Sequence, residues 1–228
     1  MSCQDDNMFS QITEYLRPRR DAFVKSFRSN TNPLLGKYRR KTLSDTNFSI
    51  ISNNCWAGIV YQYYDLPYQS PTIGLYFFAD DYVRFVSDLR HYCGCELSFI
   101  QAKNSRYHEV LKERGQDNIP IGLLDDVEIM FLHYSSPEEA MEKWDRRVRR
   151  INWDHLIIKF SQQNLATIDH LIAVDRLPYK DKIIFTTGDY GLSSQVIYKE
   201  SLGLPEIFDE VTHFKSYLDL PALINGRA

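Results

Sequence analysis

The sequence lacks the short motifs that mark familiar catalytic centres. Its 228 residues contain no G-x-G-x-x-G, P-loop, G-x-S-x-G or H-E-x-x-H pattern. They also contain no D-x-D pair, the arrangement with which many metal-dependent sugar transferases hold a nucleotide diphosphate. Cys93-x-Cys95 is half of a zinc site without a second pair at ligand spacing, and we interpret it as structural. No motif therefore names a reaction, a metal or a cofactor, and whether the chain is an enzyme stays open.

The net charge and the short hydrophobic runs exclude further classes of protein. The chain has 27 Lys and Arg against 30 Asp and Glu, a net charge of -3, so we expect no nucleic-acid partner. No apolar run approaches the roughly 20 residues of a membrane span, so we expect no transmembrane segment. The polar N-terminus carries no secretory signal, which predicts a cytoplasmic protein. In that compartment we expect free thiols at all four cysteines, Cys3, Cys55, Cys93 and Cys95.

Short apolar runs alternate with helical segments from Phe48 onward, which is typical of an α/β fold. We predict a mainly parallel or mixed sheet flanked by helices, formed by one domain over residues 48–228. Residues 1–47 are predicted to be an N-terminal helical extension and connector. The expected strands are Phe48–Ser52, Thr72–Phe78, Leu97–Ile100, Val127–His133, His155–Phe160 and Lys182–Thr187, with a short one at Ile121–Leu124 that turns at Asp125-Asp126.

Three helices follow from apolar spacing and capping residues. One is predicted to begin at Asp80 or Asp81, and another at Ser136-Pro137, where a capping box precedes the helix. The third is predicted over Asn164–Val174. Their buried stripes are expected to be Tyr82, Phe85, Val86, Leu89 and Cys93 for the first, Met141, Trp144, Val148 and Ile151 for the second, and Leu165, Ile168, Leu171 and Ile172 for the third.

Candidate ligand-binding residues lie where the predicted strands end, because open α/β sheets bind ligands at the carboxyl ends of their strands. The densest group is Ser52, Asn53 and Asn54, whose amides suit a polyhydroxylated ligand or, equally, a turn. Asp80, Asp81 and Lys159 end other strands. These groups converge only if their strands are parallel neighbours.

Two residues are candidates for catalysis. His133 is the best candidate base, because the pKa of histidine lies near neutrality. Cys55 stands where a helix N-terminus would favour a thiolate nucleophile, although an inert buried cysteine is the favoured interpretation. Arg147 flanks the buried stripe of its helix and is a candidate for binding a phosphate.

Several segments resemble an uncharacterised bacterial exopolysaccharide- and capsule-biosynthesis family. The resemblance is carried by Phe48–Gly58, which contains Ser52-Asn53-Asn54-Cys55-Trp56, by Ser70–Tyr82, by Pro120–Gly122, by Phe131–Tyr134, by Glu139-Ala140 with Trp144–Arg147, by Arg150–Asn152, by Leu218–Pro221 and by Asn225–Arg227. Ala57 replaces a glycine that the family usually has. The resemblance implies a pathway and no established active site.

Three functions compete. The first is a transferase that acts on an activated sugar or glycan intermediate, with Asn53 and Asn54 holding hydroxyls, Arg147 or Lys159 a phosphate, and His133 as base. The second is a non-catalytic scaffold of a polysaccharide-assembly complex that binds a sugar or nucleotide. The third is a cysteine hydrolase that uses Cys55 and His133. A nucleotide sugar or glycan intermediate is the expected partner; the cofactor and the oligomeric state stay unknown.

Overall fold

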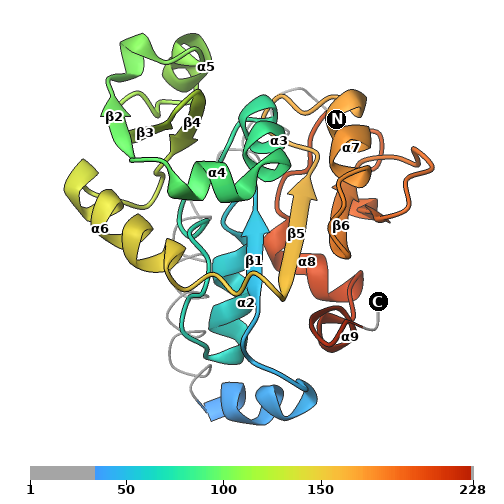
Figure 1. Ribbon diagram of the computed structural model, residues 1–228. Helices are drawn as coiled ribbons and strands as arrows, with labels where there is room; N and C mark the ends of the chain where they lie inside the picture. Colours follow the sequence, from blue (N-terminus) through green and yellow to red (C-terminus); the bar gives the residue numbers. More distant parts are fainter. Residues whose placement is uncertain (1–33, 227–228) are drawn as a thin grey trace, which may run out of the picture.

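A four-stranded parallel sheet forms the centre of the molecule. The computed structural model describes residues 34–226. The sheet contains β1 (Ser49–Ser52), β5 (Leu156–Ser161), β6 (Asp181–Thr186) and β7 (Gln195–Ile197), in that spatial order, as Figure 1 shows for the first three. All neighbouring strands run parallel, so the carboxyl ends of β1 and β5 meet at one edge. The predicted α/β class is confirmed.

Helices cover both faces of this sheet, and the alternation of side chains along each strand produces two cores. Along β5, Ile157 packs into one core and Ile158 into the other. The first core contains residues of α2 (Trp56–Tyr64) and α9 (Leu220–Ile224), with α8 (Glu210–His213) on the same side. The second contains residues of α3 (Ala79–Ser87), α4 (Leu89–Gly94), α6 (Pro137–Val148) and α7 (Ile168–Asp175).

A smaller antiparallel sheet lies at the upper left of Figure 1, beside α5 (His108–Glu113). It contains β2 (Ser98–Ile100), β3 (Ile121–Leu124) and β4 (Val127–Met130). The predicted turn at Asp125-Asp126 joins β3 to β4, with Asp125 at a φ of 53°. The described residues also form four 3₁₀ turns, at Arg40–Thr42, Ala102–Asn104, Lys199–Ser201 and Phe214–Ser216.

The predicted strand over Thr72–Phe78 is wrong. This segment makes one isolated bridge, between Tyr76 and Met130, and does not join the parallel sheet. On the outer edge of β1, side chains instead accept the hydrogen bonds of the backbone amides. The Tyr61 hydroxyl accepts from the Ile50 amide at 3.2 Å, and the Thr72 hydroxyl accepts from the Ser52 amide at 3.0 Å. The apolar residues of the segment pack as core without strand pairing.

Helix α6 begins after the Ser136 cap as predicted, but the other two predicted helices need correction. The helix expected to run through Cys93 ends at Ser87, and the carboxylate of Asp88 caps α4 by accepting from the His91 amide. The third begins at Ile168, because Asn164 and Leu165 adopt left-handed backbone angles that a helix cannot contain. The predicted burial is wrong at three positions: Met141, Leu165 and Ile168 are 39%, 48% and 50% exposed.

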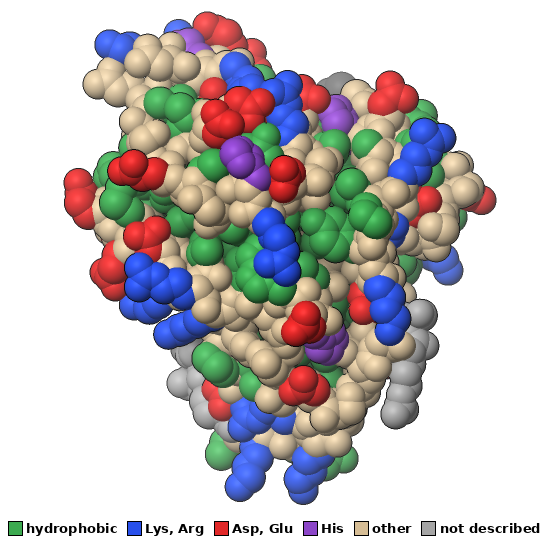
Figure 2. All heavy atoms as spheres, in the orientation of Figure 1, with side chains coloured by type: hydrophobic (Ala, Val, Ile, Leu, Met, Phe, Trp, Pro, Cys, Tyr) green, Lys and Arg blue, Asp and Glu red, His purple; other side chains and the backbone are tan. Residues whose placement is uncertain are grey.

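The predicted N-terminal extension falls mostly on residues 1–33, which lie outside the described residues, as does Cys3. Residues 34–39 are helical. Cys55, Cys93 and Cys95 are free thiols. Among the described residues, no helix has the length and apolar character of a membrane span. Acidic, basic and hydrophobic side chains are interspersed over the face drawn in Figure 2.

Candidate functional site

A lysine lies in the interior at the carboxyl end of the parallel sheet. Lys159 belongs to β5 and is completely buried. Strand alternation directs its side chain towards the face that α2 covers, where its ammonium group lies 5.7 Å from the Trp56 ring centroid and 5.5 Å from that of Phe185. Such a charge in an apolar core requires partners, because an unpaired buried ammonium is strongly disfavoured.

Lys159 finds its partners in three side chains. Its Nζ donates to Asn54 Oδ1 at 3.0 Å, to Ser161 Oγ at 2.5 Å, and to the buried carboxylate of Glu210. Burial lowers the pKa of Lys159 to about 8, although the neighbouring Glu210 carboxylate opposes this shift. The attraction of the Glu210 carboxylate therefore offsets only part of the free-energy cost of removing the Lys159 ammonium from water.

Asn54 connects this pair to the start of α2. Its Oδ1 accepts from the Trp56 backbone amide at 3.1 Å and from Ser52 Oγ at 3.0 Å, while its Nδ2 donates to Glu210 Oε1 at 2.7 Å. Both ends of the amide are thus used inside the protein. Ser52 is fully buried, and the structure supports a positioning role for its hydroxyl.

Asn53 joins the ends of two strands. Its Nδ2 donates to the Ser161 carbonyl at 2.9 Å, and its Oδ1 accepts from the Ser161 amide at 3.0 Å. This reciprocal pair extends the β1–β5 ladder by one residue through a side chain. Asn53 is completely buried and does not line the adjacent cavity, so these contacts give it a structural role.

A cavity of about 260 Å³ opens beside this cluster. Residues that follow β1 and β5 meet there with the loop after α5 and with the segment at the start of α8. Amide, aromatic and charged side chains alternate along its wall, which is formed by Asn54, Cys55, Trp56, Tyr76, Arg114, Gln116, Leu132, Gln163, Asn164, Phe208, Asp209, Glu210 and Val211. The cavity therefore lies at the sheet edge where α/β folds bind ligands.

Cys55 lines this cavity as a protonated thiol. Its Sγ lies 3.7 Å from the Leu75 carbonyl oxygen. Burial raises the pKa of Cys55 to about 11, and the nearby Lys159 ammonium counters only part of that shift. Since the thiolate is the nucleophilic form, the site disfavours nucleophilic chemistry at Cys55 near neutral pH.

The other predicted site residues lie elsewhere. His133 is exposed and does not line the cavity; its backbone amide donates to the Gly74 carbonyl at 2.9 Å. Arg147 is buried, donates to the Tyr134 hydroxyl and to the Ile73 carbonyl at 3.2 Å, and so anchors α6. Neither residue lines the carboxyl-edge cavity.

The two adjacent aspartates at the start of α3 also diverge. Asp80 is exposed and pairs with His170 Nε2 at 2.7 Å. Asp81 is fully buried and accepts from Arg106 Nη2 at 2.9 Å, and burial raises its pKa to about 6. Arg106 also binds Glu128 on β4, so Asp81 connects α3 to the small sheet. Neither aspartate lines the cavity.

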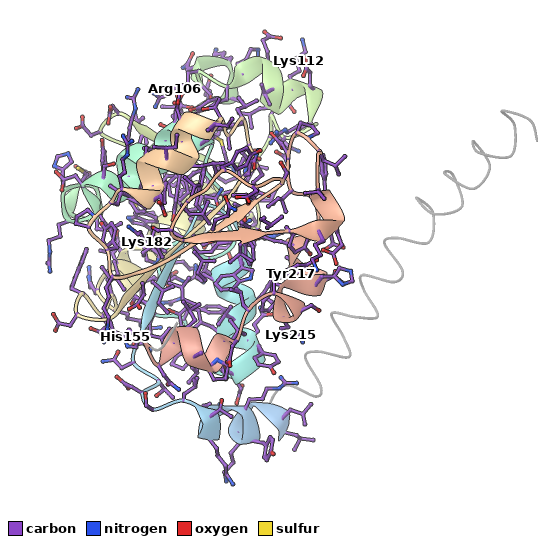
Figure 3. The ribbon with its side chains drawn as sticks, turned by 90° about the vertical axis from the view of Figure 1, so that its right-hand side faces the viewer. Arg106, Lys112, His155, Lys182, Lys215 and Tyr217 are labelled. Carbon is purple, nitrogen blue, oxygen red and sulfur yellow. The ribbon has the colours of Figure 1, made fainter. Side chains whose placement is uncertain are left out.

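A larger cavity, of about 700 Å³, lies at the opposite, amino edge of the sheet. Its wall includes His155, which precedes β5 and lies far from Arg106 in Figure 3. The guanidinium of Arg90 stacks 4.3 Å from the Trp153 ring centroid at the same cavity. Because His155 directly precedes β5, it lies at the amino edge of the sheet and away from the carboxyl-edge cavity.

Sequence reasoning missed several residues of the carboxyl-edge cavity. Glu210, Gln116 and Arg114 follow no apolar strand, and they reach the site only through tertiary folding. Lys159, by contrast, could be predicted, because a lysine inside the apolar run Leu156–Phe160 stands out in the sequence. Among residues 34–226, no group of three or more His, Cys, Asp or Glu side chains is arranged to hold a metal ion.

Comparison with known proteins assigns the sequence to a family. Residues 26–219 match the family described as a domain of unknown function (DUF1919). An uncharacterised protein of Haemophilus influenzae is 30% identical over 159 residues, which cover 70% of this chain and 71% of that protein. The matched region contains both strands of the site, the cavity wall and the Lys159–Glu210 pair. The chain belongs to the DUF1919 family.

Proposed function

We propose that the protein acts in exopolysaccharide or capsular polysaccharide biosynthesis, as a transferase for an activated sugar or glycan intermediate bound in the carboxyl-edge cavity. The observation that carries the proposal is the composition of the cavity wall, in which four amide side chains meet aromatic rings, an arginine and carboxylates. The resemblance of the Ser52–Trp56 segment to an exopolysaccharide-biosynthesis family supports the same pathway.

Hydrogen-bonding capacity remains on the wall for a sugar ligand. Gln163 makes no side-chain hydrogen bond to another described residue and is half-buried at the cavity. Gln116 uses its Oε1 to accept from the Tyr76 hydroxyl at 2.6 Å, which leaves its Nε2 for a ligand. Paired donors and acceptors of this kind match the hydroxyl groups of a sugar.

Aromatic and charged groups complete the proposed site. Phe208 is 61% exposed at the rim, where its ring offers an apolar surface to the face of a sugar. Arg114 donates to Asn164 Oδ1 at 2.8 Å and keeps other guanidinium donors for a phosphate. Asp209 is the wall carboxylate suited to taking a proton from an acceptor hydroxyl, because the Glu210 carboxylate is already engaged by the Lys159 ammonium.

The alternative is a non-catalytic scaffold that binds the same class of ligand. Two observations favour it: the pKa of the Cys55 thiol is raised, and His133, the predicted base, does not line the cavity. The cysteine-hydrolase hypothesis loses support for the same reasons. A scaffold would bind nucleotide sugars without consuming them, so product analysis separates it from the transferase.

The binding step can be tested with a panel of nucleotide sugars in a thermal-shift assay. We expect stabilisation of the parent protein by a member of the panel, and loss of that stabilisation in Gln163→Ala with little change in melting temperature. Gln101→Ala, which removes an exposed amide that is not part of the cavity wall, serves as the matched control. A Gln163→Ala protein that keeps every response of the parent would exclude this cavity as the sugar site.

A further inference from the structure

We infer that Asn54, Lys159 and Ser161 form a binding site for the phosphate group of the ligand, and that Glu210 occupies this site when no ligand is bound. The inference rests on the proposed function for the identity of the ligand, an activated sugar that carries a phosphate. It adds to that function a second subsite, behind the sugar-binding cavity, and the segment that closes it.

The first support is the convergence of donors on one carboxylate. Glu210 Oε1 accepts from the Lys159 ammonium and from Asn54 Nδ2, and Glu210 Oε2 accepts from the Ser161 hydroxyl. An ammonium, an amide and a hydroxyl thus surround a single anion. Phosphate oxygens accept the same charge-assisted hydrogen bonds, so this set of donors suits a phosphate equally well.

The second support is the contrast between the donors and the acceptor. The donors belong to the ends of β1 and β5, and the hydrogen bonds from the Trp56 amide and the Ser52 hydroxyl hold Asn54 in place. Glu210, by contrast, begins the four-residue helix α8 and follows Asp209, whose φ is 54°. The hydrogen-bonded parallel sheet therefore carries the donors, and a four-residue helix carries the anion.

The third support is the position of the same segment on the cavity wall. Phe208, Asp209, Glu210 and Val211 all line the cavity, whereas Lys159, which lies behind Asn54 and Glu210, does not. Movement of this one segment would open the cavity onto the Lys159 ammonium. The phosphate of a sugar bound in the cavity would then reach the donors that Glu210 now occupies.

Electrostatics favours this exchange. A phosphate carries up to two negative charges and Glu210 one, so the exchange places more charge beside the buried ammonium. The nine-residue helix α2 begins at Trp56, directly after Asn54 and Cys55, and its N-terminal dipole also favours an anion at this position. Buried ion pairs often contribute little to stability. A role in ligand binding therefore accounts for the buried Lys159–Glu210 pair better than a role in stability does.

The test uses inorganic pyrophosphate and isothermal titration calorimetry at pH 6.5, below the pKa of Lys159. Parent protein is expected to bind weakly, because Glu210 competes. Glu210→Gln removes the competing charge and should bind about tenfold more tightly or better. Lys159→Met/Glu210→Gln replaces the pair by neutral groups and should lose binding, while Lys112→Gln, at an exposed position on α5, should bind as the parent does.

A second measurement needs no variant. Hydrogen–deuterium exchange of residues 208–213 in the parent protein should increase when pyrophosphate is added, because Glu210 leaves its partners. The inference is overturned if Glu210→Gln binds no more tightly than the parent, if the double variant still binds, or if exchange in this segment does not rise. If the pyrophosphate tests fail but Gln163→Ala still loses nucleotide-sugar binding, the proposed function stands without the phosphate site. If the pyrophosphate tests succeed but Gln163→Ala keeps nucleotide-sugar binding, the phosphate site stands without the sugar site.

Discussion

The Thr72 hydroxyl accepts a hydrogen bond from the Ser52 backbone amide at 3.0 Å, in the place where a neighbouring strand would bind β1. The same hydroxyl lies 3.4 Å from the Ile50 carbonyl oxygen. Both backbone groups face away from β5, because the amides at alternate positions, those of Ser49 and Asn53, are the ones that donate to that strand's side. A side chain thus closes the edge of the sheet next to the candidate site.

Replacement of this hydroxyl should therefore destabilise the protein. Thr72→Val keeps the shape of the side chain but leaves the buried Ser52 amide without an acceptor, which costs about 1–3 kcal/mol of unfolding free energy. Thr72→Ser retains the hydroxyl and should cost less. Urea unfolding of the three proteins measures the difference. Equal stability of the valine and serine variants would show that the hydroxyl contributes nothing at this edge.

The buried Lys159–Glu210 pair predicts that the effects of single and double substitutions on the free energy of unfolding are not additive. Lys159→Met leaves the Glu210 carboxylate buried without its partner and should lower the free energy of unfolding by about 3–5 kcal/mol. In Lys159→Met/Glu210→Gln no charge remains, so most of the lost stability should return. A double-mutant cycle by chemical unfolding measures the coupling. Additive losses from the two single changes would contradict the pairing described here.

Asp81 predicts a pH dependence of stability. Burial raises its pKa from 3.8 to about 6, so the folded protein binds its proton more tightly than the unfolded chain between these values. Stability from this group is full below pH 3.8 and is lost as pH rises through 6, by about 3 kcal/mol at most. Thermal unfolding of the parent protein between pH 4 and pH 7 should show this loss.

Two variants test whether Asp81 is the source of that pH dependence of stability. Asp81→Asn cannot ionise, so the difference in stability between parent and variant should change across the window from pH 4 to pH 6. Asp117→Asn alters an exposed aspartate and should follow the parent. If Asp81→Asn and Asp117→Asn track the parent equally at every pH, Asp81 is not the source.

Thiol reactivity provides a further check. Without reductant, the denatured protein should show four reactive thiols, as expected from its cysteines. In the native protein Cys55 and Cys93 should react slowly, because burial raises their pKa values to about 11 and about 12. Time-resolved thiol labelling with peptide mapping measures both quantities. Fewer than four thiols after denaturation would contradict the expectation of free cysteines, and rapid native labelling of Cys55 would contradict its raised pKa.

Much of the architecture could be predicted from local patterns. The strands β1, β5 and β6 follow from apolar runs, and the start of α6 follows from Ser136 and the proline after it, because such signals act over a few residues. The run Thr72–Phe78 misled for the same reason: its residues are apolar enough for a buried strand, and only the Tyr61 and Thr72 hydroxyls decide that β1 takes no partner there.

By itself, the sequence determined which residues stand at the ends of β1 and β5, among them Asn53, Asn54 and Lys159. Only the tertiary structure decided that these strands are neighbours, that Lys159 is completely buried, and that Glu210 reaches it from 51 positions away. It likewise directed Arg147 to Tyr134 and left His133 outside the cavity. The physical reason is that strand adjacency and ion pairing depend on contacts between distant segments, on which local periodicity carries no information.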